Sequence, residues 1–143
     1  MINISYKLNK KINTHVFFAD EKFNFLANSS SILAKNAKNI SLFKEEYKNS
    51  KKVSINVFES GIKHQIYIFK IENNPSDYDC QKLGGCVLDT ISKFENINLF
   101  LENSDLIKKN YNNFIKNFFL GLFSKNYHRG ERRTALHGPR SVP

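Results

Sequence analysis

The sequence predicts an α/β fold, a mixed β-sheet flanked by helices, and two patterns lead to this prediction. Short runs in which apolar residues alternate or cluster indicate strands, and longer runs with apolar residues three or four positions apart indicate helices. These runs follow one another in the order β-β-α-β-β-α-β-α, and the strand–helix–strand succession within residues 83–101 favours a sheet covered by helices. With 143 residues, of which 41% are hydrophobic, the chain can build one ordinary core and thus a single domain.

The first part of the chain predicts two strands followed by a helix. Apolar and polar residues alternate over residues 2–8, and residues 15–19 form a short continuous apolar run that is typical of an inner strand. Serines at 29–31 offer capping hydroxyls to a one-sided helix over residues 32–40. We expect this helix to extend toward Tyr47, with its far end left open.

A hairpin and a second helix are expected next. Residues 53–57 alternate, residues 59–61 supply a turn, and residues 65–71 form a strand of high β-propensity. The Asn-Asn-Pro-Ser run at 73–76 then breaks the chain. It precedes a helical stretch whose apolar positions are Leu83, Val87, Ile91 and Phe94.

A last strand and a last helix complete the predicted order. Residues 97–101 read as a strand, and Asn-Ser-Asp at 103–105 makes a good helix start. We expect the helix to pack on the sheet and to leave Asn110, Asn113 and Lys116 in water. Its apolar face consists of Ile107, Tyr111, Phe114, Phe118 and Leu122.

Residues 128–143 differ abruptly from the rest of the chain. This segment holds every arginine of the sequence and lacks Asn, Ile, Phe and Lys altogether. We therefore expect the domain to span residues 1–127 and residues 128–143 to be an unstructured tail of foreign, fused or frameshifted origin. The alternative is a natural basic arm for an acidic partner. His128 and His137 are too far apart for a helical metal pair.

The formal net charge of +9 invites a search for nucleic-acid partners. Lysines are spread along the body among Asn, Ile and Phe, however, and the sequence shows no basic helix or RNP-like strand. The net charge is then the one feature that points to nucleic acid, and we do not expect nucleic acid as a partner. The N-terminus lacks the apolar run of a secretory signal, and residues 114–123 are shorter than the roughly 20 residues that span a bilayer. We therefore expect a cytoplasmic protein without a membrane partner.

The side chains that commonly carry out catalysis form no recognisable motif. Cys80 and Cys86 have neither CxxC nor zinc-site spacing, and we interpret them as reduced, buried thiols. His15 and His64 stand outside any hydrolase motif, and acidic pairs such as Glu45-Glu46 read as solvated charge. The sequence accordingly predicts no catalytic, cofactor-binding or metal-binding residue.

One glycine pair, Gly84-Gly85, leaves two interpretations open. Its backbone N–H groups could receive a phosphate near a helix start. Close packing of a helix on the sheet, where glycine leaves room for another backbone, is the favoured interpretation.

Two stretches resemble the N-terminal domain of the leucyl aminopeptidase (cytosol aminopeptidase) family. Residues 81–88 read Gln-Lys-Leu-Gly-Gly-Cys-Val-Leu, and residues 117–127 read Asn-Phe-Phe-Leu-Gly-Leu-Phe-Ser-Lys-Asn-Tyr. The second stretch is similar to the helix that ends in a Leu-Gly-x-aromatic pattern and a Lys-x-Tyr-like close, just before the link to the catalytic domain. The resemblance covers residues 1–127.

This resemblance implies a macrodomain-like fold that supports a homo-oligomer and shields the active sites, while a C-terminal catalytic domain holds two divalent metals, zinc or manganese. The family's Asn-Thr-Asp-Ala-Glu-Gly-Arg-type motif is absent here, so no catalytic or metal-binding residue is carried over. We expect a chain truncated before a catalytic domain that would release N-terminal amino acids from peptides. The alternative is a stand-alone macrodomain-like module that binds a nucleotide such as ADP-ribose through Gly84-Gly85.

Overall fold

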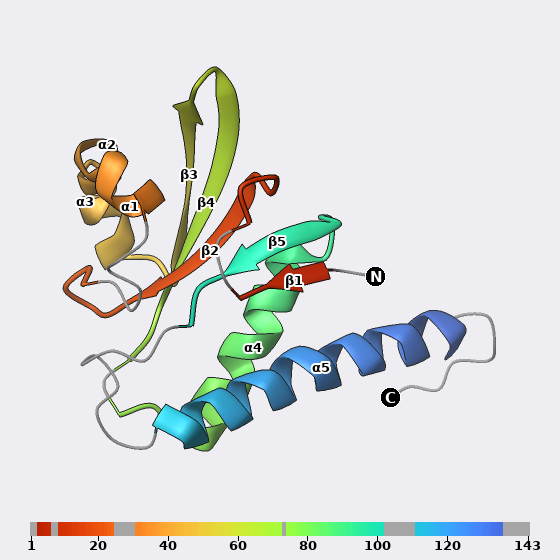
Figure 1. Ribbon diagram of the computed structural model, residues 1–143. Coiled ribbons are helices and arrows are strands. Elements are labelled where there is room, and N and C mark those ends of the chain that lie inside the picture. The colour runs from red at the N-terminus through yellow and green to blue at the C-terminus, as the bar shows by residue number, and fades with distance from the viewer. Residues whose placement is uncertain (1–2, 7–8, 25–30, 73, 102–110, 136–143) are drawn as a thin grey trace. The chain divides into compact units, whose positions relative to one another are not determined.

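The computed structural model describes residues 3–6, 9–24, 31–72, 74–101 and 111–135, and no side chain is described at position 31 or at positions 125–135. The chain divides into two compact units, which comprise residues 1–74 with 92–109, and residues 75–91 with 110–143. The first unit holds a mixed five-stranded sheet with three short helices, and the second holds two longer helices (Figure 1). The predicted α/β class is confirmed.

The sheet of the first unit has the strand order β1-β5-β2-β4-β3. Strands β1, β5, β2 and β4 are parallel to one another, and the edge strand β3 is antiparallel to β4. The central strand β2 is buried along its whole length, as expected for a continuous apolar run with a strand on either side. The bounds are Asn3–Ser5 for β1, Thr14–Ala19 for β2, Lys52–Glu59 for β3, Ile62–Lys70 for β4 and Asn96–Leu99 for β5.

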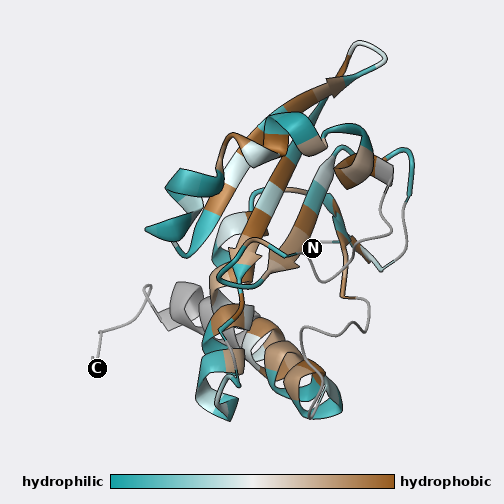
Figure 2. Ribbon diagram, turned by 90° about the vertical axis from the view of Figure 1, so that its left-hand side faces the viewer, coloured by the Kyte–Doolittle hydropathy of each residue, from teal (hydrophilic) through white to brown (hydrophobic). Residues whose placement is uncertain are grey.

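The predicted hairpin is formed by β3 and β4. Along β3, buried residues alternate with exposed ones, a pattern visible as alternating apolar and polar colours in Figure 2. Ser60 and Gly61 connect the two strands with φ angles of +52° and +77°. Two successive positive φ angles match the right-handed twist of a hairpin, and glycine adopts such an angle without strain.

The helix expected from Ile32 toward Tyr47 is three short helices, α1 (Ser31–Lys35), α2 (Ala37–Ser41) and α3 (Lys44–Lys48). The breaks fall at Asn36, with φ −113° and ψ 17°, and at Phe43, with φ −92° and ψ 4°. The Asn36 amide donates to the carbonyl oxygen of Ile32 at 2.9 Å, and such side-chain bonds compete with the helical backbone. Apolar residues of all three helices join one face of β2, β3 and β4 in a core.

The second unit consists of α4 (Asp77–Ile91) and α5 (Tyr111–Ala135). Ser76 and Asp79 cap α4 reciprocally, since the backbone N–H of each donates to the side chain of the other at 3.1 Å. On α5, burial of Phe114, Phe118 and Leu122 confirms the predicted apolar face, and Asn113 and Lys116 are exposed as expected. This face was expected to pack on the sheet; within the second unit its partner is α4.

Several expectations concern residues outside the described part of the chain. These are the ends of the first strand at Ile2 and Leu8, the caps at 29–30, and the start of the last helix with Ile107 and Asn110. The tail is described in part, because α5 continues past Tyr127 and residues 128–135 are helical where an unstructured segment was expected. Glu, Arg and Ala at 131–135 have high helix propensity, which favours this extension. A foreign origin for residues 128–143 stays a prediction.

Candidate functional site

The Gly84-Gly85 pair lies in the interior of α4 and not at its start. A Cβ atom on Gly84 would collide with the backbone carbonyl of Phe118 and would lie 2.7 Å from the backbone nitrogen of Leu122. Gly84 therefore does leave room for another backbone, but that backbone belongs to helix α5, whereas packing on the sheet was expected. Phosphate binding at a helix start, proposed for this pair as the alternative, is wrong because both glycines lie within the helix.

Gly121 plays the reciprocal part on α5. A Cβ atom on Gly121 would collide with the backbone of Gln81, and the Gln81 side chain donates to the Asn117 amide oxygen at 2.8 Å. At the other end of the contact, Asn113 donates to the carboxylate of Asp77 at 2.7 Å. The two stretches that carry the family resemblance thus meet in one helix crossing.

His15 and His64 form a buried pair on neighbouring strands of the sheet. The distance from His15 Nε2 to His64 Nδ1 is 3.0 Å, and the rings stack with their centroids 5.2 Å apart. On the other side of His15, its Nδ1 atom lies 3.2 Å from Asn98 Nδ2. The three side chains come from β2, β4 and β5 and are at most 8% exposed.

The backbone of Asn9 fixes the direction of the hydrogen bonds in this network. Its N–H donates to Asn98 Oδ1 and its carbonyl accepts from Asn98 Nδ2, both at 3.1 Å. Asn98 therefore turns its N–H₂ group toward His15, whose Nδ1 atom must accept, and neutral His15 then donates from Nε2 to His64. Burial, reinforced by the neighbouring His64, lowers the pKa of His15 from 6.5 to about 4.

The location of the network indicates a role in the fold. His15 and His64 lie near the amino ends of the parallel strands β2 and β4, and Asn98 of β5 is the residue paired with His15. Ligands of open α/β sheets bind outside the opposite, carboxyl ends of the strands. The imidazole atoms that face each other are already engaged in hydrogen bonds, so we assign the network to the packing of the sheet.

The remaining predicted chemistry is distributed over separate places. Cys80 is buried as expected, and burial together with Asp77 and Asp79 raises the pKa of its thiol to about 11, whereas Cys86 is exposed, which corrects the expectation for that residue. Glu45 is exposed and pairs with Lys48 at 3.1 Å, as solvated charge does. His128 and His137 lie outside the residues with described side chains.

Among the described residues, neither a metal-binding cluster nor a membrane-spanning helix is present. In this part of the chain, no three His, Cys, Asp or Glu side chains are grouped in a way that could hold a metal ion. No described helix has the length and apolarity needed to cross a membrane.

A tight turn follows the carboxyl end of β2. The Asp20 carboxylate accepts from the backbone N–H groups of Lys22 and Asn24, both at 2.9 Å, and from the Asn24 amide at 3.1 Å. Phe23, at the tip of the turn, has a φ of +69°, a conformation that costs a bulky side chain on the order of 1–3 kcal/mol. Charge-assisted hydrogen bonds to Asp20 hold this strained residue in place.

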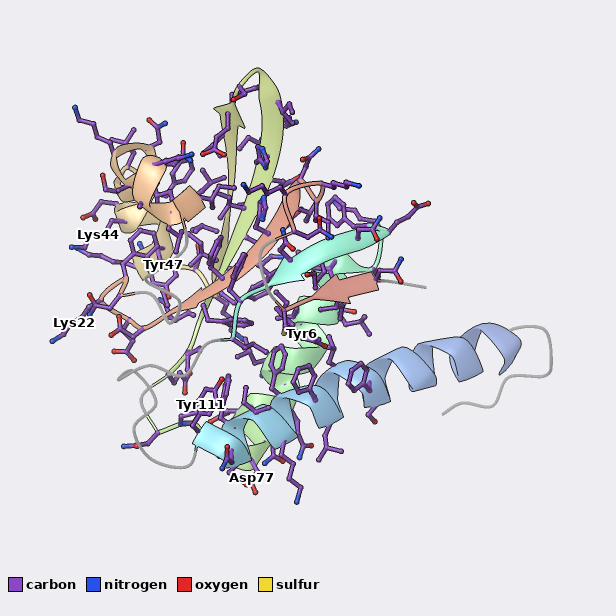
Figure 3. All side chains as sticks on the ribbon, viewed as in Figure 1. Tyr6, Lys22, Lys44, Tyr47, Asp77 and Tyr111 are labelled. Carbon is purple, nitrogen blue, oxygen red and sulfur yellow. The ribbon has the colours of Figure 1, made fainter. Side chains whose placement is uncertain are left out.

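Tyr47 of α3 anchors the turn from beneath. Its hydroxyl lies 2.8 Å from the carbonyl oxygens of both Ala19 and Asp20, and its ring packs 4.6 Å from that of Phe23. Burial raises the pKa of the Tyr47 hydroxyl, so this group stays a hydrogen-bond donor. Figure 3 shows Tyr47, Lys22 and Lys44 on the side of the sheet where α1, α2 and α3 lie.

Between this turn and the three helices lies a hollow of about 390 Å³, which we call the β2 hollow. Its floor is apolar, and two lysines on different segments stand at its border. Among the residues that the structure describes, neither Lys22 nor Lys44 has an ion-pair partner. The lining includes Lys22, Phe23, Leu33, Ala37, Ile40 and Lys44.

No protein-family model matches the chain, and no curated protein matches it.

Sequence reasoning missed both the histidine pair and the β2 hollow. His15 and His64 are 49 positions apart, and the register of parallel strands that joins them leaves no mark in the sequence. For the hollow one signal was available, because Asp, Lys and Asn directly after a predicted strand are typical of a turn. The partners that complete it come from three separate helices, whose placement depends on tertiary packing.

Proposed function

We propose that this chain is a non-catalytic structural domain of the leucyl aminopeptidase type, which binds a metallopeptidase catalytic domain and supports its homo-oligomer. The observation that carries the proposal is the crossing of α4 and α5. Residues 81–88 and 117–127 each resemble the family. Gly84 of the first stretch lies against the backbone of α5, and Gly121 of the second lies against the backbone of α4. The close contact of α4 and α5 therefore explains why each of the two stretches contains glycine.

The fold class is compatible with this proposal. The macrodomain-like domain that the resemblance implies is a mixed sheet flanked by helices, and the first unit has a mixed sheet with helices on one face. The described groups most suited to catalysis are used by the fold itself: His15 is held neutral in a hydrogen-bonded network, and the pKa of Cys80 is raised. A supporting role for the chain agrees with both features.

The surface that would bind the catalytic domain is suggested by α5. In the family, the stretch similar to residues 117–127 precedes the link to that domain. Leu120 and Phe123 lie within this stretch, three positions apart on the helix, and are 49% and 55% exposed, so they form a small exposed apolar patch. We therefore assign them to the contact with the catalytic domain.

A binding experiment in trans tests the proposal. The purified chain is mixed with the catalytic domain of a leucyl aminopeptidase whose own N-terminal domain has been removed, and the mixture is analysed by gel filtration with light scattering. We expect co-elution in a larger assembly, weakened by Phe123→Ser and unchanged by Lys116→Ser, a matched exposed position on the same helix. Separate elution of the chain from a folded catalytic domain would contradict the proposal.

The genome offers an independent test. If the chain is truncated before its catalytic domain, the DNA downstream of the Tyr127 codon should encode an Asn-Thr-Asp-Ala-Glu-Gly-Arg-type motif in another reading frame. A downstream region without this motif in any frame counts against the proposal and favours a stand-alone module.

A further inference from the structure

We propose that the β2 hollow is a binding site for a small phosphate monoester with an aromatic or short apolar body. This inference is independent of the assembly role proposed above. The β2 hollow lies where a ligand is expected, because the turn that forms one of its walls directly follows the carboxyl end of the central parallel strand β2. Open α/β sheets bind their ligands outside this end of the strands.

The lining determines the chemistry of the ligand. Leu33, Ala37 and Ile40 provide an apolar floor, and Phe23 adds an aromatic ring, which together favour a planar or short apolar body. The volume of about 390 Å³ is within the usual range of small-molecule sites, roughly 300–1,000 Å³.

The charge at the border selects an anion. Lys22 and Lys44 line the hollow from the β2 turn and from α3, and neither has an ion-pair partner among the described residues. Of the acidic residues beside them in the sequence, Asp20 is engaged by the hydrogen bonds of the turn and Glu45 by Lys48, and Glu21 is exposed. Two ammonium groups on separate segments suit a phosphate monoester, which carries close to two negative charges at pH 7, better than a carboxylate with one.

The strained turn gives an independent reason to expect a ligand here. A phenylalanine at φ +69° is costly, and the molecule keeps it there with three hydrogen bonds to the Asp20 side chain and with Tyr47 beneath. Asn or Gly would adopt this backbone without the same cost. The retained ring forms part of the wall of the hollow, where it can contact the apolar body of the ligand.

Titration with phenyl phosphate, followed by amide shifts in ¹H–¹⁵N NMR spectra at fixed ionic strength, tests the site. We expect saturable shifts centred on Lys22, Phe23 and the helices α1 and α2. Lys22→Gln and Lys44→Gln should each weaken binding about tenfold, as expected for loss of a charge-assisted hydrogen bond. Lys38→Gln is the matched control, since Lys38 is exposed on α2 but does not line the hollow.

Two further arms separate the anion from the apolar body. Inorganic phosphate should bind more weakly than phenyl phosphate, and Phe23→Asn, which tolerates the turn but removes the ring, should abolish that preference. Benzyl alcohol, which lacks the charge, should not bind. Absence of saturable shifts with phenyl phosphate, equal binding of benzyl alcohol, or equal weakening by Lys38→Gln would overturn the proposal.

Discussion

At the scale of single residues, a few polar side chains determine how the sheet is held together. Asn98 accepts a hydrogen bond from the backbone N–H of Asn9, which is 89 positions away, and donates one to its carbonyl oxygen. These two bonds orient the Asn98 amide and thereby determine which nitrogen of His15 accepts and which donates to His64. Tyr47 holds the turn after β2 through its hydroxyl, which lies within hydrogen-bond distance of the carbonyl oxygens of Ala19 and Asp20. The sequence predicted that His15 lies in a strand, but its partners could not be predicted because they depend on strand register.

The histidine network predicts a dependence of stability on pH. The pKa of His15 is about 4 in the folded chain against 6.5 in its usual environment, so between these values the unfolded chain binds more protons. The free energy of unfolding should therefore fall as the pH falls from 6.5 to 4, by up to about 3 kcal/mol. Urea unfolding of wild type and His15→Leu across this range measures the effect. A wild type whose pH slope equals that of the variant would contradict it.

Tyr47→Phe tests the anchor beneath the β2 turn. The substitution keeps the buried ring but removes the hydroxyl that lies within hydrogen-bond distance of the carbonyl oxygens of Ala19 and Asp20. We expect a loss of about 0.5–1.5 kcal/mol in the free energy of unfolding, the net contribution of one hydrogen bond, because both carbonyl oxygens keep a backbone donor, Ile71 N–H for Ala19 and Phe23 N–H for Asp20. The exposed Tyr78→Phe is the matched control and should be neutral. Equal stabilities of the two variants would show that the hydroxyl contributes nothing.

At the scale of elements, local patterns predicted the sheet and the long helices well. Alternation in β3 and the run in β2 follow from burial on one or both faces, and the hairpin turn follows from Ser60 and Gly61. Residues 31–48 were predicted as one helix but form three, because the helical spacing of apolar residues continues across Asn36 and Phe43, where the backbone leaves the helix. The spacing of apolar residues predicts which side of a helix faces the core, but it does not predict where the helix is interrupted.

The α4–α5 crossing makes a prediction that opposes helix propensity. Alanine is favoured over glycine in a helix by about 1 kcal/mol, but a Cβ at Gly84 or Gly121 would collide with the facing backbone. Gly84→Ala and Gly121→Ala should each destabilise the chain by about 1–3 kcal/mol, the usual cost of overpacking. Thermal unfolding measures this, with the exposed Cys86→Ala on α4 as a control that should be neutral. Stabilisation by either glycine variant would refute the close contact.

At the scale of the whole molecule, the boundary of the domain was predicted from composition alone. Among the residues of α5 whose side chains are described, 111–124, Leu122 is the last buried one, and the helix continues to Ala135. Deleting everything after Tyr127 should therefore leave the melting temperature nearly unchanged, whereas Phe118→Ala should cost roughly 3–5 kcal/mol and Lys116→Ala little. Chemical denaturation of these variants decides the matter. If the deletion destabilises the chain as much as Phe118→Ala does, the boundary at Tyr127 is wrong.

The proposed role, support of a peptidase by a chain that has no peptidase activity of its own, can be checked by an activity measurement. The purified chain is incubated with leucine amide and leucine-containing peptides in the presence of added zinc or manganese, beside a mock preparation from cells without the chain. Because a two-metal hydrolase needs several ligands grouped around its ions, we expect no turnover above the mock preparation. Turnover that exceeds the mock preparation and disappears on chelation of the metal would show that the chain is itself a peptidase.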